Sequence, residues 1–116
     1  MKPGLQITET SVRQVRVLHL AGYLDGHTFV EFERRLRELF DAGCCRVVID
    51  LSALSYIASA GVGVIINGQH QAKQLGGCLQ LVKPSPAVRE IFSILGLDAL
   101  FTIHDSVEQG VAAAAS

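Results

Sequence analysis

Apolar and polar positions alternate near the start of the chain, and short apolar runs return at intervals further on. Residues 5–8 alternate as a strand does, and the β-branched run within residues 12–22 predicts a second strand, paired with the first as a hairpin. Residues 45–51 (CRVVIDL) form a continuous apolar run, typical of a strand that is covered on both faces. Residues 78–82 and 100–104 predict two more short strands.

Four segments between and after these strands have helical spacing. In the first, the apolar side chains at 29, 32, 36, 39 and 40 share one face, and Gly43 ends the helix. The second runs from about residue 59 to the Gly76–Gly77 pair, the third ends at Gly96, and the last follows a cap at Asp105 or Ser106. The order β-β-α-β-α-β-α-β-α predicts an α/β fold.

This order also predicts the topology. We expect a single domain over residues 1–116, with a mixed, mostly parallel sheet of four to five strands, an N-terminal antiparallel hairpin and about four flanking helices.

Composition narrows the possible functions. The 116 residues are 49% hydrophobic and 18% charged, with a net charge of −1. The charges are interleaved, so nothing favours nucleic acid or an anionic membrane as a partner. We expect a cytoplasmic protein without membrane insertion, because no apolar run has the length of a signal peptide core or a membrane span.

Cysteines and histidines do not suggest a metal site or a cofactor. Cys44 and Cys45 are neighbours and Cys78 is isolated, a spacing that fits neither a disulfide framework nor zinc. We interpret all three as small buried residues at strand starts. The four histidines are scattered, without a pair at helical spacing.

The segment DLSALSYIASAGVGVII, residues 50–66, carries the candidate chemistry. Loops at the carboxyl ends of parallel strands are where function collects in such sheets, and Ser59 lies where a helix cap belongs. Gly61 and Gly63 in the first turn each cost a helix about 1 kcal/mol relative to alanine. Such glycines are kept for close approach of a backbone, a side chain or a partner surface, or for tight helix–sheet packing.

Two interpretations of Ser59 follow from the residues alone. In one, the serine only caps the helix. In the other, its hydroxyl is functional, and the free N–H groups and partial positive charge of the helix N-terminus would tolerate a phosphate there. Catalysis is disfavoured, because the loop is neither a nucleophile elbow nor a phosphate-binding loop. Asp25, Asp50 and Asp105 could converge at the same sheet edge, but three such aspartates do not make a metal site.

The whole chain resembles a STAS domain in its free-standing, anti-anti-sigma form. The segments LAGYLDGHT, VVIDLSALSYIASAGVGVI and LVKPSPAVREIFSILGLDALFTIHDSVEQGV carry the resemblance, in the family's order. The resemblance implies a non-enzymatic module. Its unphosphorylated form binds an anti-sigma factor that is itself a serine kinase, and this frees a sigma factor. Phosphorylation ends the binding, and a serine phosphatase restores it.

The resemblance also assigns residues. Ser59 matches the phosphorylated serine, Asp25 the acidic residue near it, and Gly61 and Gly63 the glycines of the recognition helix. The expected partner surface comprises Asp25, Tyr56, Ala58, Ser59, Ala60, Gly61 and Gly63. Tyr56 could instead pack beneath its loop. We expect a monomer or weak dimer.

Ala58 departs from the family pattern, which usually has an acidic or amide residue before the serine. The change fits either a differently specialised kinase or a domain that is never phosphorylated. It therefore favours an alternative role, an accessory subunit that docks on the ATPase of a membrane lipid transporter. A small hydrolase is a third possibility, disfavoured because the chain lacks a credible triad.

Overall fold

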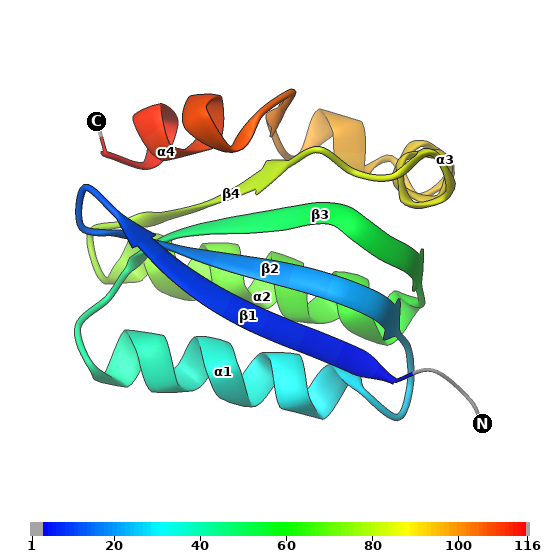
Figure 1. The fold of residues 1–116 in the computed structure, drawn as a ribbon, viewed down its shortest axis with the longest axis horizontal. Helices are drawn as coiled ribbons and strands as arrows, with labels where there is room; N and C mark the ends of the chain where they lie inside the picture. The colour runs from blue at the N-terminus through cyan, green and yellow to red at the C-terminus, as the bar shows by residue number, and fades with distance from the viewer. Residues whose placement is uncertain (1–3, 116) are drawn as a thin grey trace.

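A five-stranded sheet forms the middle layer of the protein (Figure 1). The computed structural model describes residues 4–115. The strands are β1 (Leu5–Val12), β2 (Val15–Leu24), β3 (Arg46–Ile57), β4 (Cys78–Val82) and β5 (Ile103–His104). The helices are α1 (Phe29–Asp41), α2 (Ser59–Gln74), α3 (Pro86–Ile94) and α4 (Val107–Ala115), with a 3₁₀ turn, η1 (Leu97–Ala99).

The strands lie in the order β1-β2-β3-β4-β5. β1 and β2 form the antiparallel hairpin, and all other neighbours are parallel. The predicted α/β class, topology and hairpin are therefore confirmed. The first strand is longer than expected and continues to Val12, whereas the last is confined to Ile103–His104.

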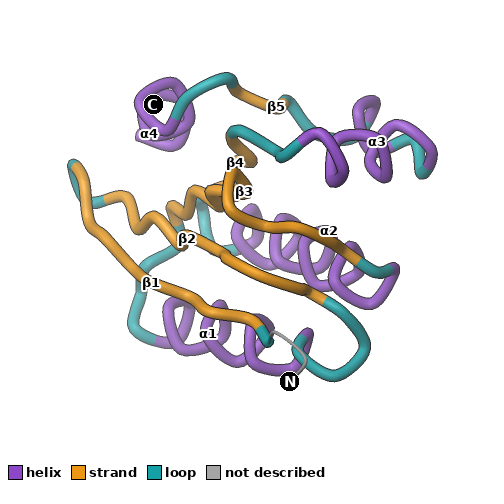
Figure 2. The backbone as a smooth tube through the Cα atoms, turned by 45° about the vertical axis from the view of Figure 1, so that its right-hand side comes forward, coloured by secondary structure: helices purple, strands orange, loops and turns teal. Residues whose placement is uncertain are grey.

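Helices cover both faces of the sheet (Figures 1 and 2): α1 and α2 lie on one side, and α3 and α4 on the other. The larger core joins the sheet to α1, α2 and α3, with Phe32 of α1 and Phe92 of α3 completely buried. A smaller core lies beneath α4, where Val111 and Ala114 pack with valines of β2, β3 and β4. The cysteines are free and only partly buried, rather than fully buried as expected.

β3 is the main correction to the expected boundaries. It does not end at Leu51 but continues to Ile57, so residues 52–57 form a strand rather than a loop. The pairing with β2 shows why: His19 and Ala21 pair with Asp50 and Ala53, so β3 holds one extra residue there. A second extra residue lies between Leu54 and Tyr56, opposite Gly22 and Tyr23. These two β-bulges bend the strand and aim its end toward α2.

Candidate functional site

Ser59 is the first residue of α2 and is exposed to solvent. The N-cap is Ala58, whose backbone is extended (φ −97°, ψ 168°), and no side chain caps the helix. The interpretation of Ser59 as the helix cap is therefore wrong. Because the capping position is taken by an alanine, the Ser59 hydroxyl is not required for starting the helix.

A backbone hydrogen bond ties the start of α2 to the end of β2. Leu24 pairs with Ile57 in the parallel ladder, and the Ala58 N–H donates to the Leu24 carbonyl over 2.8 Å. Asp25 follows Leu24 directly, just as Ser59 follows Ala58. The parallel register thus brings together the two loops that the sequence singled out.

Asp25 organises its own loop. Its Oδ1 accepts hydrogen bonds from the His27 N–H at 2.9 Å and the Thr28 N–H at 3.1 Å, while the Thr28 hydroxyl donates to the Tyr23 carbonyl at 2.8 Å. The hydrogen bond from the His27 N–H, followed in size by that from the Thr28 N–H, holds the pKa of the Asp25 carboxyl below its ordinary value. Burial acts in the opposite direction and raises this pKa, but it is the smaller effect. Asp25 is therefore an anion that orders the turn before α1.

The two glycines of the first turn have different surroundings. A Cβ on Gly61 would lie 2.6 Å from Cγ of Leu24 and 3.1 Å from Cγ1 of Ile57, and both of these side chains are buried. A Cβ on Gly63 would meet nothing within 4 Å. Packing inside the protein therefore explains Gly61 but not Gly63, which is exposed.

Tyr56 lies on the surface instead of packing beneath the loop. Its exposed fraction is 43%, and its ring lies 6.2 Å from the ring of Tyr23, tilted by 39°. Ala58 and Ala60 are half-buried beside it in the chain. Small side chains and one aromatic pair therefore border the exposed start of α2.

The three aspartates do not converge. Asp50 lies inside β3, seven residues before its end, where it is buried and hydrogen-bonded to His19. Asp105 lies between β5 and α4 and is exposed, and Ser106 rather than Asp105 accepts the capping bond from the Gln109 N–H. Among the three, Asp25 alone follows the strand end that is hydrogen-bonded to the start of α2.

Residues 4–115 contain no group of three or more His, Cys, Asp or Glu side chains arranged to hold a metal ion. Within the same part of the chain, no helix has the length and apolar character needed to cross a membrane. Leu24 is a site residue that the sequence did not indicate. Its carbonyl joins the two loops and its side chain is the one that Gly61 accommodates.

Comparison with known proteins places this arrangement in a family. The STAS domain model matches residues 6–110. BtrV of Bordetella bronchiseptica, a presumed anti-sigma factor antagonist, is 33% identical over 109 residues, which cover 94% of each chain.

Solved structures of antagonists share the fold. One from Mycobacterium paratuberculosis superimposes with a TM-score of 0.87 at 20% identity, covering 97% of this chain and 96% of that one. The antagonist SpoIIAA in its unphosphorylated form has a TM-score of 0.76 at 24% identity, covering 93% of each chain. Phosphorylated Bacillus SpoIIAA has a TM-score of 0.70 at 23% identity, covering 94% of this chain and 97% of that one. The chain belongs to the STAS domain family, and anti-sigma factor antagonists are among its relatives.

Proposed function

We propose that this protein is an anti-sigma factor antagonist whose unphosphorylated form binds an anti-sigma factor serine kinase and so releases a sigma factor. Phosphorylation of Ser59 ends the binding, and a serine phosphatase restores it. The protein itself acts as a binding module without catalytic activity in this role. The observation that carries the proposal is the exposed Ser59 at the first residue of α2, beside the Asp25 loop, in a chain whose relatives are anti-sigma factor antagonists.

The fold can accept a phosphate on Ser59. A phosphoserine carries about −1.5 to −2 charges at neutral pH. At a helix N-terminus such a charge faces unpaired N–H groups and the positive end of the helix dipole, which stabilises it by about 0.3–1 kcal/mol. Because Ser59 is exposed, its modification displaces no buried side chain.

The same phosphate would oppose a docked partner. The net charge of the chain would change from −1 to about −3, with the change concentrated at one end of α2. An unmatched charge buried in an interface costs about 2–5 kcal/mol, and each 1.4 kcal/mol lowers affinity about tenfold. One phosphate therefore releases a micromolar partner without any refolding.

Gly63 supports a partner that approaches α2 closely. Its exposed Cα faces open space, and glycine at this helical position costs about 1 kcal/mol relative to alanine. A partner backbone seated against Gly63 accounts for a residue that packing within the chain does not require.

Ala58 favours one competing role. Since the N-cap offers no side-chain acceptor, a kinase has no acidic residue or amide at this position to recognise. A domain that docks on a transporter ATPase without being phosphorylated needs the same surface but no such residue. The test must therefore separate a switched partner from a constitutive one.

The experiment compares baits in a pull-down from lysate of the source cell, with bound proteins identified by mass spectrometry. The baits are the parent chain, Ser59→Asp and a charge-matched control, Ser55→Asp, which places the same charge at an exposed position of β3. We expect the parent and Ser55→Asp to retain a kinase-type ATPase that Ser59→Asp loses. Incubation of the parent chain with this ATPase and ATP should add one phosphate, which intact-mass analysis detects and peptide mapping should locate at Ser59.

Two outcomes contradict the proposal. Retention of the same transporter ATPase by all three baits would identify the alternative, constitutive role. A kinase that binds Ser59→Asp as tightly as the parent would show that charge at Ser59 does not control the interface.

A further inference from the structure

A chain of three polar side chains crosses β1, β2 and β3, away from the Ser59 loop. The Thr10 Oγ1 and the His19 Nε2 are 3.0 Å apart, and the His19 Nδ1 lies 2.7 Å from Oδ2 of Asp50. The other carboxylate oxygen of Asp50 accepts the Ser52 N–H at 3.0 Å. A hydroxyl, an imidazole and a carboxylate are thus held in a row, the arrangement that activates hydroxyl nucleophiles.

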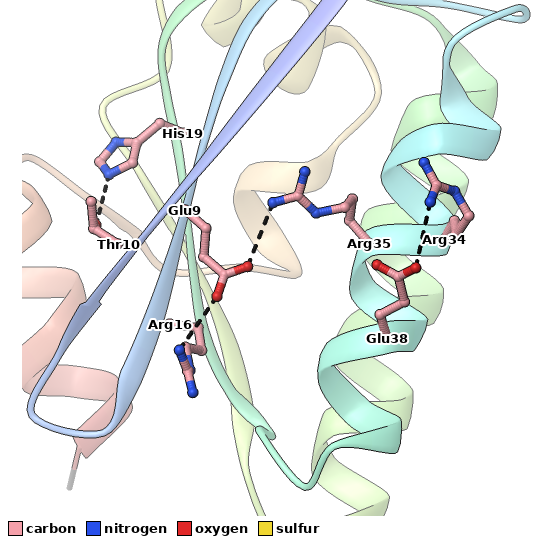
Figure 3. A network of polar contacts seen from close by, with 7 residues as sticks. All are labelled: Glu9, Thr10, Arg16, His19, Arg34, Arg35 and Glu38. Atoms are coloured by element: carbon pink, nitrogen blue, oxygen red, sulfur yellow. Dashed lines mark hydrogen bonds and ion pairs between the residues drawn. The ribbon is translucent and has the colours of Figure 1, made fainter.

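The register of the sheet fixes this row. His19 and Asp50 are direct partners in the parallel ladder between β2 and β3, and Thr10 lies on β1 opposite Val17, two residues from the position facing His19. Figure 3 shows the Thr10 hydroxyl directed at the His19 ring. Glu9, the neighbour of Thr10, points to the other face, where it pairs with Arg35 of α1.

The protonation pattern follows from Asp50. Its burial raises the pKa of the carboxyl, but hydrogen bonds from Ser52 and His19 outweigh this effect and leave the pKa below its ordinary value, so Asp50 is a carboxylate. A carboxylate can only accept, so Nδ1 of His19 carries the donated proton. In the neutral ring, Nε2 is then the acceptor for the Thr10 hydroxyl proton.

Solvent exposure increases from Asp50 through His19 to Thr10, as activation of a hydroxyl nucleophile requires. The side chain of Asp50 is 12% exposed and that of His19 32% exposed, while Thr10 belongs to the exposed part of the edge strand β1. The orienting carboxylate is therefore shielded from water, and the hydroxyl is open to a reagent from solution.

We propose that Thr10 is an activated hydroxyl that accepts an acyl group from a small, neutral ester or thioester donor. The Thr10 oxygen forms a bond to the acyl carbon, the bond from that carbon to the leaving oxygen or sulfur breaks, and the hydroxyl proton passes to Nε2 of His19. The imidazolium, stabilised by Asp50, then returns the proton to the leaving group or to water. No oxidant or further reactant is needed.

The surroundings define the donor class. The negative charge of Asp50 disfavours anionic donors such as acyl phosphates. Thr10 lies on an open strand face rather than in an enclosed cavity, so a small donor reaches it and a long specific substrate would find little to bind. The site is accordingly a modification site with a single acyl transfer.

The test uses p-nitrophenyl acetate as the donor, with p-nitrophenolate release followed by absorbance and the acetylated residue mapped by mass spectrometry. We expect one acetyl group on Thr10 of the parent chain. His19→Asn should label Thr10 about 100-fold more slowly, because general bases typically contribute factors of this size. Thr10→Val should carry no label at this position.

Thr8→Val is the matched control. Thr8 directly faces His19 in the β1–β2 register, two residues before Thr10 on the same strand, but the His19 Nε2 is hydrogen-bonded to Thr10, so loss of the Thr8 hydroxyl should leave Thr10 labelling unchanged. The proposal is overturned if Thr10 is unlabelled or if it reacts equally fast in His19→Asn.

Discussion

Alanine at Gly61 and at Gly63 should change the stability of the protein in opposite directions, although both residues lie in the first turns of the same helix. The added methyl group is identical in the two variants, and so is the gain in helix propensity of about 1 kcal/mol. The difference comes from what the methyl group meets. At Gly61 it meets Leu24 and Ile57, and at Gly63 it meets open space.

The magnitude follows from the packing. The new Cβ at Gly61 would lie 2.6 and 2.8 Å from two carbons of Leu24, and neither Leu24 nor Ile57 is more than 1% exposed, so neither can move into solvent. Overpacking of this kind costs about 1–3 kcal/mol. After the gain in propensity, Gly61→Ala should lower the free energy of unfolding by up to about 2 kcal/mol. Gly63→Ala should raise it by up to about 1 kcal/mol.

Urea unfolding followed by circular dichroism measures both variants against the parent chain. The expected separation between them is about 2 kcal/mol, equivalent to roughly 8 °C in Tm for a domain of this size. Unfolding energies that agree within about 0.5 kcal/mol, or a Gly61→Ala variant more stable than the parent, would refute the reasoning that Gly61 exists to seat α2 on β2 and β3.

Three further predictions follow from individual contacts. Ser85→Ala should lower the free energy of unfolding by about 1–2 kcal/mol in urea titrations, because the Ser85 hydroxyl caps α3 and donates to the Leu54 carbonyl at 2.6 Å. The pKa of Asp50 is lowered in the folded protein, so its contribution to stability is present above the ordinary pKa of 3.8 and is lost as pH falls through the folded pKa. Between about pH 7 and pH 3, the Tm should therefore fall less steeply for Asp50→Asn than for the parent chain. Equal slopes of Tm against pH would contradict this assignment. Glu9 pairs with Arg16 and Arg35 (Figure 3), but both ion pairs are long and solvent-exposed. Glu9→Gln should therefore change the free energy of unfolding by less than about 1 kcal/mol. A larger loss of stability in thermal melts would show that the two pairs act as a network.

Periodicity predicted the elements well where one face is buried and the chain keeps a regular register. The buried positions of α1 are those of the expected apolar face, and the hairpin pairs Val12 with Val15 as its two-residue turn requires. Glycine signals also held at helix ends: Gly43 and Gly76 have φ of 85° and 87°, the left-handed conformation that closes α1 and α2.

The second half of β3 could not be read from its pattern. Leu51, Leu54 and Ile57 are buried, and their spacing of three residues matches neither a regular strand nor a helix of that length. Two bulges restore these side chains to the core, and a bulge depends on the partner strand, which local sequence does not contain. The contact between His19 and Asp50 was not predicted either, because the two residues are 31 positions apart and meet only through the pairing of β2 with β3.

The N-cap residue of α2 could not be predicted from the sequence either. Serine is a strong N-cap residue and alanine a poor one, so propensity favoured Ser59 over Ala58. The ladder between β2 and β3 decided otherwise, because its last bond holds the Ala58 N–H on the Leu24 carbonyl and fixes where the helix begins. Tertiary structure here overrides local preference.

The bond between Ala58 and Leu24 has a consequence for how the surface can diversify. Because backbone atoms hold the two loops in place, the shape of the surface does not depend on the exposed side chains at positions 56 and 59. Those side chains can be exchanged without deforming the site that presents them. Two domains with this backbone can thus differ in what they bind through surface substitution alone, while the scaffold that presents those residues remains the same.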